Sequence, residues 1–337
     1  MSPRSRAETP PRKVVVGTTI FGSGRPYPGL AERATQLCGL VDEMALQATA
    51  TPRGVLDLAI LPEAVLTPNA VEASERSVPL DDPVFETFRA LARRHRTYLV
   101  VPLDLEEPGR SGPVYSNAAV LLDRAGEVSG IYRKAHPVAL VGEDDLEGGV
   151  TPGDAYPVFD CDFGRVGIQI CWDVVFADGW AALSDAGAEI VALPSASPAT
   201  VLPASLAARH RYFVVSSTPR NNATVYEPTG MVAARLEQPG GVLVHELDLS
   251  HAVVGWSSFL RDGAALRDRF GARVGYHYDA REDLGLFWSN DPATPVAEML
   301  RSIGGEEIDD QIARNQRRYE SVARKASGAC VSRDHED

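Results

Sequence analysis

Cys171 is the residue in this sequence whose type and position best suit covalent chemistry. It follows the segment 164–170, in which apolar β-branched residues alternate with others, a pattern typical of a half-buried strand. A thiol between the end of a strand and the start of a helix can have a lowered pKa and attack a carbonyl or nitrile carbon. The alternative is a buried structural cysteine, which is the commoner role of a lone thiol.

Glu63 and Lys134 also stand at the ends of apolar segments. Glu63 follows the segment 58–61, where its carboxylate could act as a general base; a helix-capping or solvated glutamate is the alternative. Lys134 follows the segment 128–133, and the alternative is a lysine that protects a sheet edge. Only three of the 33 basic residues are lysines. Because arginine would protect an edge equally well, a lysine here favours a task that needs a compact ammonium.

The elements that would position these residues can be inferred from the hydrophobic pattern. Segments rich in β-branched residues predict strands, and the amphipathic segments between them predict helices. The order begins β-α-β-α-β, an α/β pattern, and turns at 123–127 and 227–230 then predict hairpins, so the sheets should be mixed. We expect strands at 14–20, 58–61, 98–103, 118–122, 166–170, 190–193, 213–216, 224–226 and 242–247, and helices at 30–48, 83–95, 178–186 and 204–211.

The character of the sequence changes after about residue 249. The segment 255–300 is rich in Gly, Trp, Phe and Asp and shows few alternating strands, whereas 306–326 predicts a charged helix with a narrow apolar stripe. We therefore expect three regions. These are a flexible N-terminal tail at 1–12, a main domain at 13–250, and a C-terminal extension at 251–337 that packs on the core and at a subunit interface.

Charge and cysteine content exclude several classes of protein. The chain has 337 residues, of which 33 are basic and 46 acidic, and a formal net charge of −13. Since no basic cluster is present, we expect no nucleic-acid binding. The four cysteines match neither a zinc pattern nor a CxxC pair, which predicts reduced thiols in the cytoplasm. The N-terminus lacks the apolar core of a signal peptide, and no apolar stretch reaches the ~20 residues that span a bilayer, so we expect no membrane association.

Three motifs resemble those of the nitrilase or carbon-nitrogen hydrolase superfamily. They are Leu61-Pro62-Glu63, Tyr132-Arg133-Lys134 and Gly167-Ile168-Gln169-Ile170-Cys171-Trp172-Asp173. Each motif alone is weak evidence, but their order and separations make the resemblance specific, and it extends from about residue 14 to 249. The resemblance implies an α/β fold, a four-layer α-β-β-α sandwich with two mixed β-sheets. It also implies homodimers or higher homo-oligomers and a reaction that needs no cofactor and no metal.

The resemblance further implies roles for the residues in these motifs. Glu63 matches the general base, Lys134 the catalytic lysine and Cys171 the nucleophile. The Lys134 ammonium and the backbone N–H of Trp172 would stabilise the oxyanion that forms when the thiolate attacks. Glu63 would protonate the leaving amine and then activate the water that splits the thioester.

Other residues are expected close to the substrate. Many members of the superfamily have a second acid between the lysine and the cysteine. Glu147 lies nearest the expected spacing from Pro152-Gly153, Glu143 is the competitor, and a solvated acidic loop is the alternative to both. The candidate substrate-binding residues are Trp172, Glu143, His136, and Ser195 and Ser197 in a loop at another strand end, whose small polar residues predict a compact polar substrate.

The expected function is hydrolysis of a non-peptide amide or carbamoyl C–N bond of a small molecule through a thioester. Asp173 resembles the amidase and carbamoylase branches, whereas Trp172 is frequent in nitrilases, so nitrile hydrolysis on the same triad is an alternative. A catalytically silent binding or scaffold protein on the same fold is another. It is motivated by the segments 176–178, 206–211 and 218–222, which depart from the family pattern.

Overall fold

The computed structural model describes residues 6–22, 24–68, 71–139, 142 and 144–331, with the side chains described as far as residue 324. Contacts divide the chain into two units. The larger unit is Lys13–Leu249, and the smaller joins the residues up to Arg12 to those from Ser250 onward. No helix among the described residues is long and apolar enough to cross a membrane.

The first sheet of the larger unit has six strands in the order β12-β1-β2-β3-β4-β5. β1 pairs in parallel with β2, and β2 with β3, whereas β12, β4 and β5 pair antiparallel with their neighbours. The sheet is therefore mixed, as predicted. Its strands are β1 (Lys13–Thr19), β2 (Leu58–Ile60), β3 (Tyr98–Gly109), β4 (Gly112–Leu122), β5 (Val128–Arg133) and β12 (Val242–Asp248).

The second sheet repeats this plan, with the order β11-β10-β9-β8-β7-β6. β7, β8 and β9 run parallel, whereas β6 pairs antiparallel with β7, β10 with β9 and β11 with β10. The two sheets face each other, and Thr18 Oγ1 donates a hydrogen bond across them to the carbonyl of Ser216 (2.7 Å). The strands are β6 (Val158–Cys161), β7 (Gly164–Ile168), β8 (Ile190–Pro194), β9 (Phe213–Ser217), β10 (Ala223–Tyr226) and β11 (Val232–Leu236).

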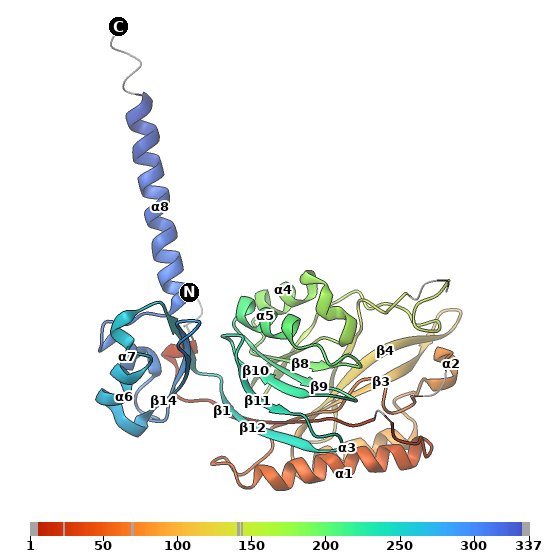
Figure 1. Ribbon diagram of the computed structural model, residues 1–337. Coiled ribbons are helices and arrows are strands. Elements are labelled where there is room, and N and C mark those ends of the chain that lie inside the picture. The colour runs from red at the N-terminus through yellow and green to blue at the C-terminus, as the bar shows by residue number, and fades with distance from the viewer. Residues whose placement is uncertain (1–5, 23, 69–70, 140–141, 143, 332–337) are drawn as a thin grey trace. The chain divides into compact units, whose positions relative to one another are not determined.

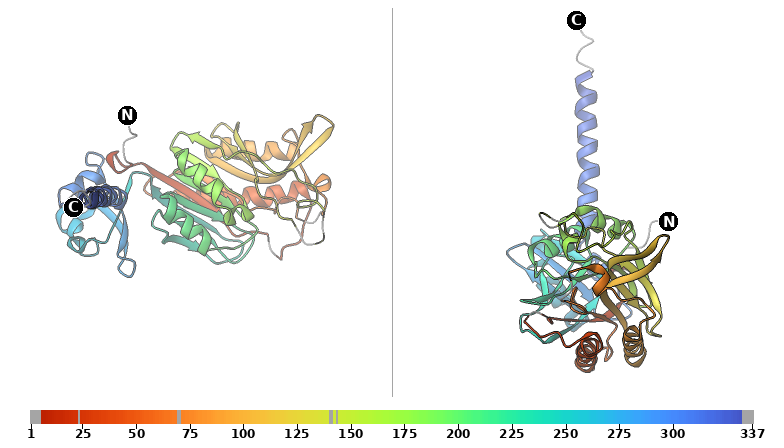
Figure 2. Two further views of the ribbon diagram at one scale, coloured as in Figure 1. Left: turned by 90° about the horizontal axis from the view of Figure 1, so that it is seen from above. Right: turned by 90° about the vertical axis from the view of Figure 1, so that its right-hand side faces the viewer.

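Helices cover the outer face of each sheet, which completes the four-layer α-β-β-α sandwich (Figures 1 and 2). α1 (Leu30–Ala48) and α3 (Pro83–His95) cover the first sheet, and α4 (Ala177–Asp185) and α5 (Val201–His210) cover the second. Local sequence explains where α3 begins. Asp82 caps it by accepting a hydrogen bond from Val84 N (2.8 Å), and Pro83 occupies the first turn, where no intrahelical donor is needed.

The smaller unit contains a three-stranded antiparallel sheet in the order β13-β15-β14, in a region where we expected few strands. Its glycines explain the difference. Gly275 lies opposite Trp288 and Gly285 opposite Tyr278, and a Cβ on Gly275 would come within 2.2 Å of the Trp288 ring. Each glycine thus makes room for an aromatic ring across the strand pair. The strands are β13 (His251–Gly255), β14 (Val274–Asp279) and β15 (Leu284–Ser289).

Short helices complete this smaller unit. The N-terminal segment contributes η1 (Arg6–Glu8), whose Ala7 is fully buried in a core with Ala252, Phe287 and Met299. A long helix, α8 (Ile308–Val331), ends the described chain, close to the predicted helix at 306–326. The other helices of the unit are α6 (Ala264–Phe270), α7 (Val296–Arg301), η3 (Ser258–Leu260) and η4 (Gly271–Arg273).

Candidate active site

Four strands of the larger unit lead to the candidate residues. β2 leads to Glu63 and β5 directly to Lys134, while in the second sheet β7 leads to Cys171 and β8 to Ala196. Parallel strands place their carboxyl ends at one edge of a sheet. The sandwich therefore gathers residues that are far apart in the sequence.

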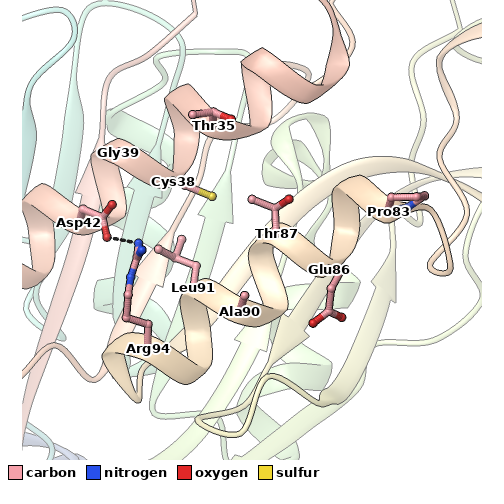
Figure 3. A pocket seen from close by; sticks show the side chains of 10 residues that line it. All are labelled: Thr35, Cys38, Gly39, Asp42, Pro83, Glu86, Thr87, Ala90, Leu91 and Arg94. Atoms are coloured by element: carbon pink, nitrogen blue, oxygen red, sulfur yellow. Dashed lines mark hydrogen bonds and ion pairs between the residues drawn. The ribbon is translucent and has the colours of Figure 1, made fainter.

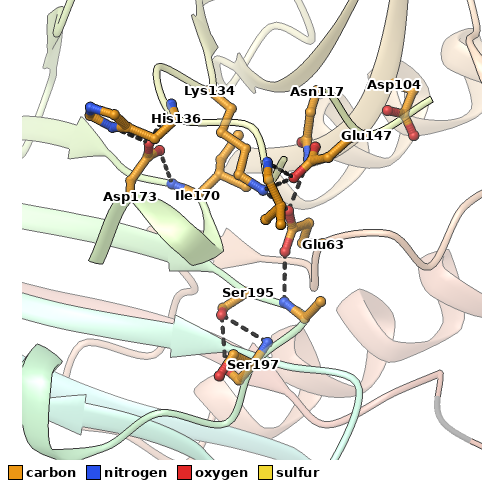
Figure 4. Close-up of polar contacts among 12 residues, drawn as sticks. Glu63, Asp104, Asn117, Lys134, His136, Glu147, Ile170, Asp173, Ser195 and Ser197 are labelled. Carbon is orange, nitrogen blue, oxygen red and sulfur yellow. Dashed lines mark hydrogen bonds and ion pairs between the residues drawn. The ribbon is translucent and has the colours of Figure 1, made fainter. Parts of the chain in front are cut away.

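Lys134 is the centre of a buried polar network (Figure 4). Its Nζ lies 2.9 Å from Glu63 Oε1 and 2.6 Å from Glu147 Oε1, and its side chain is only 1% exposed. Burial alone would lower the pKa of Lys134, but the negative charges of Glu63 and Glu147 outweigh it and raise this pKa above its usual value. The lysine is therefore held as an ammonium.

Backbone and amide donors fix both carboxylates. Asn117 Nδ2 donates to Glu63 Oε1 (2.9 Å) and to Glu147 Oε2 (3.0 Å). The backbone N–H of Ala196 donates to Glu63 Oε2 (2.7 Å), so the second sheet holds a residue of the first. Burial favours the neutral acid at Glu147, but Lys134 and the hydrogen bonds from Val138 and Asn117 lower the pKa of Glu147 overall.

The second acid of the network is Glu147, and Glu143 lies outside the described residues. Glu147 has a left-handed backbone, with φ +45°. Its segment is held from the other side by α2 (Ala73–Arg76). Ala73 N donates to the carbonyl of Gly148 (2.7 Å), and Arg76 Nη2 donates to the carbonyl of Glu147.

Cys171 sits on a tight turn between β7 and η2 (Cys171–Val175), with a left-handed φ of +46°. Buried Asp173 closes this turn. Its carboxylate accepts hydrogen bonds from Ile170 N (2.9 Å), His136 N (3.0 Å) and Tyr132 OH (2.8 Å). Such a backbone conformation costs of order 1–3 kcal/mol and is kept where surrounding contacts enforce it.

The expectation of a lowered pKa at Cys171 is wrong. Burial, followed by the negative charge of Glu63, raises the pKa of this thiol to about 11, although Lys134 and a hydrogen bond with Ser195 act in the opposite direction. The helical dipole that we invoked comes from a single 3-10 turn, which is too short to offset burial. The resting residue is a thiol, so a base must take its proton as it attacks.

A cavity of about 350 Å³ opens onto these groups. Glu63, Lys134, Glu147 and Cys171 all line it. The other lining residues are Ala64, Thr67, Pro68, Val71, Arg76, Asp104, Asn117, Val138, Gly148 and Ala196.

Comparison with known protein families identifies the family of this chain. The model of the carbon-nitrogen hydrolase family matches residues 25–253, which is most of the chain. The chain belongs to the carbon-nitrogen hydrolase family. The predicted resemblance and the predicted sandwich are both confirmed.

Similarity to three individual proteins can be stated in numbers. The chain is 30% identical to β-ureidopropionase of Arabidopsis thaliana over 56% of its own length and 46% of that protein. It is 28% identical to deaminated glutathione amidase of Homo sapiens over 58% of its length and 67% of that protein. It thus spans less than half of the first relative. Among solved structures, Saccharomyces cerevisiae Nit3, a member of the nitrilase superfamily, superposes with a TM-score of 0.58 at 19% identity, covering 70% of this chain and 90% of Nit3.

Four residues expected at the substrate lie outside the lining of the cavity in this carbon-nitrogen hydrolase. Trp172 is 44% exposed and packs on the ring of Phe176, because the tight turn directs successive side chains to different sides. His136 bonds to Asp173 through Nδ1 (2.9 Å) and stacks on Phe176. Ser195 Oγ donates a hydrogen bond to the carbonyl of Ser197 (2.8 Å). Ser195 does not line the cavity, but it also forms a hydrogen bond with Cys171, which does.

Sequence reasoning missed Asn117, the backbone N–H of Ala196, and the Arg76–Asp104 ion pair on the wall of the cavity. Asn117 had a signal, since it is a polar residue directly before the apolar run 118–122 of the same strand. No sequence signal marks the hydrogen bond from the Ala196 N–H to Glu63, because a backbone donor does not depend on residue type.

A second, larger cavity of about 690 Å³ lies between α1 and α3 (Figure 3). It includes Cys38, whose pKa is raised to about 12 by burial and by Asp42. Two of its charged groups, Asp42 and Arg94, form an ion pair with each other. In the described part of the chain, no group of three His, Cys, Asp or Glu side chains is placed to hold a metal ion.

Proposed function

We propose that this carbon-nitrogen hydrolase cleaves a non-peptide amide or carbamoyl C–N bond of a small molecule, through a thioester on Cys171. One observation carries the proposal: Lys134 Nζ is held between Glu63 and Glu147 in the cavity that Cys171 lines. A thiol, a carboxylate base and a fixed ammonium can together supply the nucleophile, the proton transfer and the oxyanion stabilisation of acyl transfer.

In the first half-reaction, Glu63 takes the proton of Cys171 as Sγ attacks the carbonyl carbon. The tetrahedral oxyanion forms beside the Lys134 ammonium, and each such donor contributes about 3–4 kcal/mol to transition-state stabilisation. Glu63 then returns the proton to the leaving nitrogen, and the C–N bond breaks to give an amine or ammonia and a thioester.

In the second half-reaction, Glu63 removes a proton from water, and the resulting hydroxide attacks the thioester. The oxyanion again faces Lys134. When the C–S bond breaks, the proton held by Glu63 returns to Sγ and the acid product leaves. The raised pKa of Cys171 suits this step, because the thiol is its stable resting form.

The test measures ammonia release from a panel of small primary amides, carbamoyl compounds and nitriles. Replacement of Cys171 by alanine is expected to reduce turnover at least ~10³-fold while the circular dichroism spectrum and melting temperature stay unchanged. Cys38→Ala, which alters a buried thiol away from the site, is the control and should stay active. Turnover of nitriles alone would favour the nitrilase alternative, and no turnover of any compound would favour a silent binding protein.

We also propose a homo-oligomer in which α8 pairs with α8 of a second copy. Ile312, Tyr319 and Val322 are 50%, 69% and 55% exposed and recur at the spacing of a coiled-coil seam. Asp309 and Asp310 lie near the start of the helix, whereas its later turns carry arginines. An antiparallel pair would bring these opposite charges together. The later arginines are Arg314, Arg317, Arg318 and Arg324.

A further inference from the structure

We propose that Asp104 determines the specificity of this pocket, and that it selects substrates carrying a cationic nitrogen at the end remote from the bond that is cleaved. The inference rests on the proposed function for the reaction at Cys171. It adds the chemical class of the group at the other end of the substrate.

Asp104 is placed in the pocket by the register of the first sheet. It lies on β3 directly opposite Asn117 of β4, the residue that bonds to both Glu63 and Glu147. Its side chain is 12% exposed and lines the same cavity as Cys171. Figure 4 shows its carboxylate beyond Glu147, on the side of the site away from Asp173 and His136.

The carboxylate of Asp104 keeps one oxygen for a ligand. Oδ2 lies 2.9 Å from Arg76 Nε, and among the described residues no donor bonds to Oδ1. Arg76 cannot turn away to serve an anionic ligand, because its two Nη groups donate to the carbonyls of Val71 and Glu147. Because Asp104 lines the cavity, an N–H donor on a bound substrate can bond to Oδ1.

The charges around the cavity favour a cation. Its lining contains three carboxylates, Glu63, Glu147 and Asp104, and two cations, Lys134 and Arg76, both already paired. Burial raises the pKa of Asp104, and the charges of Glu147 and Glu63 add to this effect, although Arg76 acts in the opposite direction. With three carboxylates against two cations, a substrate ammonium would balance the charge of the cavity, whereas a substrate carboxylate would add to its negative excess.

The remaining lining fits a short aliphatic linker. Pro68, Val71, Val138 and Ala196 present carbon atoms around the polar groups. The substrate class is therefore an amide or carbamoyl compound at one end of a short aliphatic chain, with a primary ammonium at the other end.

The test compares three amides built on the same five-carbon backbone: δ-aminovaleramide, which is cationic, valeramide, which is neutral, and glutaramate, which is anionic. Homologues one methylene shorter and longer allow for the length of the pocket. We expect kcat/KM to fall in the order cationic, neutral, anionic, with at least about tenfold between the first two. Equal values, or a preference for glutaramate, would overturn the proposal.

The variant Asp104→Asn separates specificity from positioning. It should lower kcat/KM for δ-aminovaleramide at least about tenfold more than for valeramide, because only the former loses an ionic partner. A matched control is Glu106→Gln, which removes a carboxylate from the same strand but outside the cavity lining and should leave the preference unchanged. An equal loss for all three amides would mean that Asp104 acts only by placing Arg76, which contradicts the proposal.

Binding distinguishes failure of this inference from failure of the proposed reaction. Calorimetric titration of the same amides into the Cys171→Ala protein needs no turnover. Tighter binding of δ-aminovaleramide than of valeramide, weakened at least about tenfold by adding Asp104→Asn, would support the pocket assignment even if no amide is hydrolysed. Equal binding of the two amides, no binding of either, or tighter binding of glutaramate would overturn it.

Discussion

At the scale of single residues, Glu63 disfavours the thiolate of Cys171 in the resting protein, whereas in the proposed reaction it is the base that removes the thiol proton. The negative charge of Glu63 is one of the causes that raise the pKa of the thiol to about 11, so little thiolate exists at neutral pH. The same carboxylate is the base that would remove the proton when a substrate is bound. Ground-state reactivity and turnover should therefore respond in opposite directions to the loss of this charge.

Glu63→Gln is expected to accelerate alkylation of Cys171 at neutral pH and to abolish hydrolysis. In the native protein the alkylation rate should rise with pH toward a midpoint near 11. Without the carboxylate the midpoint moves down, and each unit gives about tenfold more thiolate at pH 7. Iodoacetamide labelling followed by peptide mass spectrometry measures both. Cys38 provides an internal reference, and slower labelling of Cys171 in the variant would contradict the assignment.

Lys134→Arg is expected to lower kcat at least ~10²-fold although the charge is kept. The ammonium occupies a buried position between two carboxylates, where a planar guanidinium does not fit. The matched control is Arg133→Lys, the neighbouring residue, whose partner is Glu107 on the outside of the sheet. Steady-state kinetics should place the control within twofold of the native enzyme. Native-like kcat for Lys134→Arg would exclude a role for the lysine at the oxyanion.

At the scale of elements, the segment that carries Glu147 is held by close backbone approach. Gly148 and Gly149 both have positive φ, +72° and +97°, but only Gly148 faces a neighbour, since a Cβ there would lie 2.0 Å from the carbonyl oxygen of Val71. The two glycines form a matched pair for testing how precisely Glu147 must be placed.

Gly148→Ala is expected to lower kcat/KM at least about tenfold, because the segment must move away from the Val71 carbonyl and take Glu147 with it. Gly149→Ala carries a comparable backbone cost of about 1–2 kcal/mol but meets no atom within 4 Å, so its loss of activity should be smaller. Kinetics and melting temperatures of both variants separate placement from stability. Equal activity losses in the two would contradict the argument.

The helices and strands differ in how well the sequence predicts them. The limits of α1 and α3 agree with the predicted ranges, because their apolar periodicity and the Asp82–Pro83 start are local signals. The cross-strand pairs of Gly275 and Gly285 with aromatic rings could not be foreseen, since the pairing depends on residues far along the chain. The same holds for the site. Residue types indicated Glu63, Lys134 and Cys171, whereas the position of Asp104 opposite Asn117 depends on sheet register.

At the scale of the whole molecule, the proposed assembly depends on α8. Removal of the chain from Glu306 onward should lower the mass measured by light scattering, because the seam of Ile312, Tyr319 and Val322 is lost. Ile312→Glu combined with Tyr319→Glu should have the same effect. Ala313→Glu, one residue away from the seam, is the control. An unchanged mass after truncation would remove α8 from the interface.

The division of the site between the two sheets has a consequence for the chain as a whole. The first sheet contributes Glu63, Asn117 and Lys134, and the second contributes Cys171 and Ala196. The strand β12 follows all strands of the second sheet in the chain, but it pairs with β1 in the first sheet. A cut between Gly153 and Val158 would yield two fragments, the first with Glu63, Lys134 and Glu147 and the second with Cys171. Neither fragment should hydrolyse amides alone, and recovery of hydrolysis on mixing would report that the fragments have met. The enzyme is thus a natural candidate for split-protein complementation.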